Sequence, residues 1–111
     1  MAVDLTDLEP RVRAHEGEWT ALRVEVTFKP ITSGLSKNST AAEFESAEWL
    51  ASVAVWESGE LDLDAGRKAD GWLVAKHYDL DAMTELDAVL AEVVALFRDG
   101  SVPVDAFTSW L

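Results

Sequence analysis

The stretch that decides the fold is EFESAEWLASVAVWESGELDLD, residues 43–64 of the 111-residue chain. It contains seven carboxylates and two tryptophans but no lysine or arginine. Apolar residues alternate with other residues on both sides of Glu57-Ser58-Gly59, which is typical of two strands joined by a tight turn. The stretch therefore predicts a β-hairpin, and it raises the question of why so much uncompensated negative charge lies on it.

The length of the turn decides which side chains of the hairpin share a face. A two-residue turn at Ser58-Gly59 would mix apolar and charged residues on both faces. A three-residue loop, Glu57–Gly59, pairs Val55 with Leu61 and gives Gly59 the left-handed conformation that glycine adopts at least cost. We predict the three-residue loop, with Val53, Val55, Leu61 and Leu63 in the core and with Ser52, Ala54, Trp56, Glu60, Asp62 and Asp64 on the opposite face.

Upstream of the hairpin, the pattern predicts a helix, a strand and a loop. Apolar residues fall on one side of a helix over residues 5–19, with Gly17 expected to end it. Strict alternation over residues 22–29 indicates a half-buried strand, and Pro30 is expected to stop it. Residues 31–40 are rich in Ser, Thr, Gly and Asn and predict a loop. Residues 42–55 supply one long strand or two shorter ones.

Downstream of the hairpin, the sequence predicts a polar turn over residues 64–70 and a strand over residues 72–78. An apolar stripe indicates a helix over residues 82–97, capped by Asp79 or Asp81 and ended by Gly100. The tail after Gly100, residues 101–111, is expected to dock on the body of the protein rather than to form a contact surface. Its large apolar residues are Phe107, Trp110 and Leu111.

These elements predict an α+β fold in a single domain over residues 1–111. Short connections favour an antiparallel sheet of about four strands, with the N-terminal and C-terminal helices packed on one face. The opposite face of the sheet would then be solvated, and it would carry the acidic residues of the hairpin.

The charge of the chain limits its partners. Twenty-one acidic residues against nine basic ones give a net charge of −12, which repels nucleic acid and anionic membrane surfaces. No apolar run approaches the roughly 20 residues of a membrane span, and the chain contains no cysteine. We therefore expect a cytoplasmic protein without nucleic-acid or membrane partners. Two explanations of the charge stay open: solubility alone, or recognition of a basic partner.

The sequence offers few of the patterns that catalysis requires. The two histidines, His15 and His77, have no second histidine at ligand spacing. Asp62-x-Asp64 and Asp79-x-Asp81 lack the glycine and glutamate that would continue a calcium-binding loop. Neither a glycine-rich phosphate loop nor a Gly-x-Ser-x-Gly motif occurs. We therefore expect no enzyme, and no catalytic, cofactor-binding or metal-binding residues.

The order of the elements and the hairpin segment VAVWESGE, residues 53–60, resemble the TriTu-type immunity proteins of bacterial polymorphic toxin systems. The resemblance spans roughly residues 22–97, and the aromatic tail after Gly100 departs from it. It implies a protein that binds a toxin made by the same cell and blocks its active site or an essential surface. Toxins that attack nucleic acids are often basic, and opposite charge would then speed association.

Trp56 lies among carboxylates, as an aromatic anchor does in a binding hot spot, unless a helix covers that face and buries it. The predicted partner-binding residues are Glu43, Glu45, Glu48, Trp56, Glu57, Glu60, Asp62 and Asp64. Functions from other classes stay open: a secretion or export chaperone with an apolar groove, an acidic mimic of nucleic acid, or a subunit of a larger assembly. A homodimer stays open as well.

Overall fold

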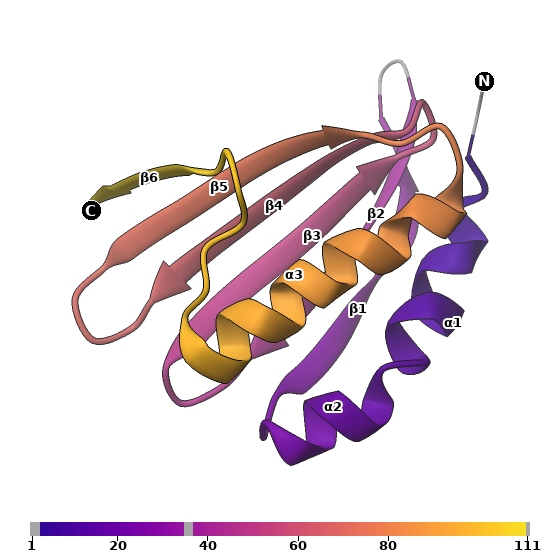
Figure 1. Ribbon diagram of the computed structural model, residues 1–111. Helices are drawn as coiled ribbons and strands as arrows, with labels where there is room; N and C mark the ends of the chain where they lie inside the picture. Colours follow the sequence, from indigo (N-terminus) through magenta and orange to yellow (C-terminus); the bar gives the residue numbers. More distant parts are fainter. Residues whose placement is uncertain (1–2, 35–36, 111) are drawn as a thin grey trace.

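The computed structural model describes residues 3–34 and 37–110, and its centre is a six-stranded antiparallel sheet (Figure 1). The strands lie side by side in chain order. The predicted α+β class is confirmed, but the sheet has six strands instead of about four. The strands are β1 (Glu25–Ser33), β2 (Asn38–Glu45), β3 (Trp49–Trp56), β4 (Glu60–Arg67), β5 (Trp72–Asp79) and β6 (Phe107–Trp110).

The N-terminal helix is interrupted, which the sequence did not predict. A 3₁₀ turn, η1 (Leu5–Asp7), is followed by α1 (Leu8–Arg13) and then by α2 (Glu16–Ala21). The expectation that Gly17 ends the helix was wrong, because Gly17 lies inside α2. The break between the helices accompanies the burial of Trp19, whose indole N–H donates to the Val12 carbonyl at 2.9 Å. The Trp19 ring also packs on Phe44 of β2, with 5.0 Å between ring centroids.

β1 runs through Pro30, which was expected to stop it. An edge strand tolerates proline because the missing N–H faces no second neighbour. β1 is such an edge, and its register with β2 shifts between Lys29 and Thr32, next to the proline. The predicted loop over residues 31–40 is correspondingly shorter, since β1 reaches Ser33 and β2 begins at Asn38. Residues 35 and 36 of that loop lie outside the described residues.

The hairpin follows the predicted register. Val55 pairs with Leu61 and Val53 with Leu63, across the three-residue loop at residues 57–59. Gly59 has a φ of 96°, and its N–H donates to the Trp56 carbonyl at 2.9 Å. Residues 42–55 contain two strands, separated by a turn at residues 46–48. The polar turn predicted at residue 64 starts only after Arg67, where β4 ends.

The second helical segment begins with η2 (Met83–Glu85) and continues as α3 (Leu86–Asp99). Gly100 ends it in the left-handed conformation, with a φ of 75°, as predicted. Neither Asp79 nor Asp81 caps it. The Glu85 carboxylate instead accepts the backbone N–H groups of Asp81 and Ala82, at 3.0 and 3.2 Å. No helix among the described residues is long and apolar enough to cross a membrane.

Figure 1 shows α1, α2 and α3 along one side of the sheet. That side holds the hydrophobic core, in which helix residues meet every second residue of the central strands. The side chains that are fully buried there include Val12, Leu86, Leu90, Val93 and Leu96 from the helices and Phe44, Val53, Val55, Leu61, Leu63 and Val74 from the strands.

The tail docks through its backbone rather than through its aromatic side chains. Residues 107–110 form β6, which pairs with β5 at the edge of the sheet. Phe107 and Trp110 nevertheless remain 70% and 64% exposed. Pro103 is the buried contact of the segment that leads to β6. Leu111, the last apolar residue of the predicted tail, lies outside the described residues.

Truncating a side chain should lower the free energy of unfolding much more on one face of the hairpin than on the other. Leu63 is fully buried, so we expect Leu63→Ala to lower the free energy of unfolding by about 2–5 kcal/mol. Leu50 is 49% exposed on the other face, and we expect Leu50→Ala to change it by only about 0.5 kcal/mol. Urea denaturation of both variants measures the difference, and equal losses would contradict the register.

Glycine substitutions test the hairpin loop. A Cβ at Gly59 would lie 2.2 Å from the Leu80 carbonyl oxygen, and the positive φ disfavours any other residue. We expect Gly59→Ala to destabilise the fold by at least about 1–3 kcal/mol in urea denaturation. Gly17 provides the control because a Cβ there meets nothing within 4 Å inside a helix. Gly17→Ala should stabilise the protein by about 0.5–1 kcal/mol.

Candidate functional site

The side of the sheet away from the helices is the open face. It is defined by alternate residues that the strand register places together. Carboxylates occur on four of its strands, and they include five of the eight predicted partner-binding residues. The open face consists of Glu25, Thr27, Lys29, Ser39, Ala41, Glu43, Glu45, Leu50, Ser52, Ala54, Trp56, Glu60, Asp62, Asp64, Gly66, Leu73, Ala75, His77, Asp79, Phe107 and Ser109.

Most carboxylates of the open face have a cation beside them. Lys29 Nζ lies 3.4 Å from Glu43, and Lys68 Nζ lies 2.5 Å from Glu45. Lys37 pairs with Glu60 and holds the pKa of that carboxyl below its usual range, with help from the Ser58 hydroxyl. His77 Nδ1 lies 2.7 Å from Asp62, and its Nε2 lies 3.1 Å from Asp79. These contacts partly neutralise the acids that the sequence alone left uncompensated.

Among the described residues, two carboxylates of the open face take part in no ion pair: Glu25 on the edge strand β1, and Asp64. Asp64 lies in the middle of β4, opposite Ser52 of β3 and Ala75 of β5. Although Asp64 is exposed, desolvation raises its pKa above the usual range of an aspartate, and the charge of Asp62 on the same strand adds to this effect. Asp64 is therefore a carboxylate at the centre of the open face whose ionised form an external cation would stabilise.

The remaining predicted residues lie at the ends of β3. Trp56 belongs to the open face, opposite Ser39, and is half-buried without a covering helix. Glu57 lies in the hairpin loop, where its carboxylate accepts the backbone and side-chain N–H groups of Asn38 at 3.2 and 3.3 Å. Glu48 is exposed in the turn between β2 and β3. The predicted set therefore does not converge on one point; its members on the open face spread along the strands.

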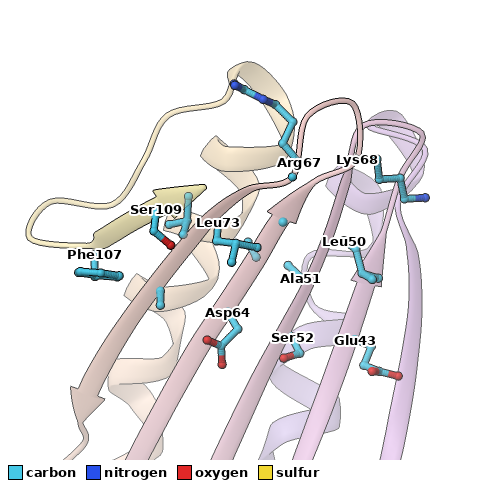
Figure 2. A pocket seen from close by; sticks show the side chains of 15 residues that line it. Glu43, Leu50, Ala51, Ser52, Asp64, Arg67, Lys68, Leu73, Phe107 and Ser109 are labelled. Carbon is cyan, nitrogen blue, oxygen red and sulfur yellow. The ribbon is translucent and has the colours of Figure 1, made fainter. Parts of the chain in front are cut away.

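A hollow of about 630 Å³ occupies the end of the open face nearest the β2–β3 turn. Figure 2 shows Leu50 and Leu73 on either side of it, with Phe107 of β6 at its margin. Asp64 and Glu43 are the carboxylates that line it. Its complete lining is Glu43, Leu50, Ala51, Ser52, Asp64, Ala65, Gly66, Arg67, Lys68, Gly71, Leu73, Val74, Ala75, Phe107 and Ser109.

The hollow was not predicted from the sequence. Leu50, Gly66 and Leu73 lie on three different strands, and they become neighbours only through the pairing of β3 with β4 and of β4 with β5. Phe107 reaches the hollow because the tail forms β6, and no strand was predicted in the tail. The available signal was the strand-favouring composition of residues 107–110, which include Phe107, Thr108 and Trp110; a strand there places Phe107 and Ser109 on one face.

The described residues contain no cluster of three or more His, Asp or Glu side chains arranged to hold a metal ion. His77 is exposed and lies between two carboxylates, which raise its pKa, Asp62 most strongly. This arrangement forms an ion-pair network on the surface. The open face offers carboxylates, exposed apolar side chains and a half-buried tryptophan.

Comparison with known families identifies the chain. The family model of Immunity protein TriTu matches residues 12–96, which cover all but the first turns, the end of α3 and the tail. No curated protein and no solved structure matches the chain. Immunity proteins are typically not enzymes, in agreement with the interpretation of the sequence. The match confirms the resemblance carried by the hairpin: the chain belongs to the TriTu immunity protein family.

Proposed function

We propose that this protein neutralises a basic cognate toxin in the cytoplasm by binding it through the open face. Membership of the immunity family implies a toxin as the partner. The observation that supports this particular surface is the position of Asp64, which has no ion pair among the described residues and lies in the middle of an uncovered, acid-rich face. A toxin that acts on nucleic acids needs a basic surface of its own, and the open face would cover that surface.

The ion pairs of the open face do not oppose such binding. Lys29 and Glu43 keep 55% and 44% of their side-chain surface exposed, and exposed pairs of this kind contribute only about 0–1 kcal/mol. A toxin cation can therefore replace an internal partner at little cost. With a net charge of −12, the chain also attracts a basic toxin over distance, which accelerates association at low salt.

The decisive experiment isolates the toxin and tests its neutralisation. We expect the tagged protein to retain a single basic polypeptide from a native cell lysate at low salt and to release it at high salt. Expression of that polypeptide alone should arrest growth, and co-expression of the protein should restore it. Reversal of Asp62 and Asp64 to lysine should slow association by about 10-fold or more at low salt and flatten its salt dependence.

The matched control reverses Glu16 and Asp81, which are exposed outside the open face, and gives the same net charge. Surface plasmon resonance should give this control variant an association rate close to that of the wild type. If both double variants protect cells equally well, the open face is not the binding surface. If no captured polypeptide is toxic, the proposed neutralisation is wrong.

His77 makes the open face sensitive to pH. Its pKa is raised by Asp62 and Asp79, so protonation stabilises the folded state. That stabilisation is complete below the unfolded pKa of about 6.5 and disappears as the pH rises through the higher folded pKa. We expect His77→Gln to lose stability relative to the wild type at pH 5.5 and to match it at pH 8.5, measured by urea denaturation.

A nuclear magnetic resonance titration of the His77 ring protons checks the cause. Asp62→Asn should lower the pKa of His77, because it removes the strongest of the contacts that raise it. An unchanged pKa in this variant would show that the contact with Asp62 does not form in solution.

A further inference from the structure

The hollow on the open face combines an apolar floor with a carboxylate. In the register of the sheet, Leu50 pairs with Gly66, and Gly66 with Leu73. In the next row Asp64 pairs with Ala75, and Ala75 with Phe107. The hollow exists because glycine and alanine stand between larger side chains, so that Leu50, Leu73 and Phe107 form its sides. Figure 2 shows this arrangement around Asp64.

The apolar sides of the hollow are accessible. Leu50, Leu73 and Phe107 are 49%, 36% and 70% exposed, although the strands of Leu50 and Leu73 carry buried residues on their other face. Exposed apolar groups that line a recess with a few polar groups are typical of binding sites. The volume of about 630 Å³ lies in the range of sites that bind other molecules, and it is large enough for a side chain of a partner protein.

The charge of the hollow specifies the kind of segment. The bases at its rim are already engaged: Lys68 lies 2.5 Å from Glu45, and Arg67 lies 2.6 Å from Asp70. Asp64 is exposed and has no ion pair among the described residues, and desolvation together with the charge of Asp62 raises its pKa. A cation with an apolar stem would satisfy both Asp64 and the exposed leucines.

We propose that the hollow receives a loop of the cognate toxin that inserts an arginine side chain, with its guanidinium at Asp64 and its stem over Gly66 between Leu50 and Leu73. This proposal rests on the proposed function and names the residue of the toxin that the open face selects. Arginine suits the site better than lysine, because its planar group binds a carboxylate through two hydrogen bonds and also stacks on an aromatic ring such as Phe107.

The tail then becomes a determinant of specificity. The family match ends at residue 96, whereas Phe107 and Ser109 line the hollow from β6. One side of the binding site is therefore built by a segment outside the part of the chain that matches the family. Changes in β6 would alter which toxin is bound without changing the core.

The test uses the toxin isolated with the wild-type protein and measures dissociation constants by calorimetry. Three variants alter the hollow: Asp64→Asn removes the charge, Phe107→Ala removes the side wall, and Gly66→Val fills the floor. A Cβ at Gly66 meets only the Leu73 side chain, at 3.5 Å, and valine favours strands, so Gly66→Val should fold. Each variant should weaken binding about 10-fold or more, as expected within a hot spot.

Two variants serve as matched controls. Trp110→Ala removes an equally exposed aromatic from the other face of β6, and Glu16→Gln removes one charge from α2. Both should bind within about twofold of the wild type, as surface changes outside a hot spot usually do. Thermal unfolding of all five variants separates a loss of binding from a loss of folding.

A double-mutant cycle identifies the inserted residue. Each arginine on the toxin surface is changed to glutamine, alone and together with Asp64→Asn in the immunity protein. For one arginine, the loss of affinity in the pair should be smaller than the product of the two single losses. If the wild-type protein binds the toxin and the three hollow variants bind it equally well, the proposed role of the hollow is wrong, while the proposed function stands. A wild-type protein that binds no toxin would overturn both.

Discussion

The register of the β3–β4 hairpin is the constraint on which the rest of the structure depends. Pairing Val55 with Leu61 and Val53 with Leu63 sends four apolar side chains toward the helices. The same pairing sends Asp62 and Asp64 to the open face, because neighbouring residues of a strand point in opposite directions. A slip of one residue would bury these carboxylates against α3, where a charge without a partner costs several kcal/mol. Gly59 enforces the register by supplying the backbone conformation that the loop requires.

The concentration of acids on one face lowers the stability of the sheet but favours contact with an external cation. Like charges on neighbouring strands repel each other and weaken the sheet. The chain limits this repulsion with a few bases, among them Lys29, Lys37 and Lys68, each placed beside one carboxylate. Among the described residues no base lies beside Asp64, and a partner that supplies a cation there would offset the repulsion from Asp62. Sites that bind other molecules commonly retain such locally unfavourable groups.

Local patterns predicted the elements that depend on local physics. The hairpin, the strand predicted over residues 72–78 and the helix ended by Gly100 follow from alternation, helical spacing and glycine chemistry. The errors arose where distant contacts decide the conformation. The break in the N-terminal helix accompanies the packing of Trp19 on Phe44. Pro30 is tolerated because β1 is an edge, and β6 pairs with the free edge of β5. The hollow shares this origin, since no sequence pattern joins Leu50, Gly66 and Phe107.

The irregular edge at Pro30 has a consequence for how this protein meets others. A sheet with a regular free edge invites strands of other chains to add to it, which leads to aggregation. Here one edge carries a proline and a register shift, and the other, β6, is only four residues long. Neither offers a long, continuous row of backbone groups for strand addition. The open face, with its exposed leucines and Phe107, can therefore remain available to side-chain recognition, while the polypeptide backbone takes little part in choosing a partner.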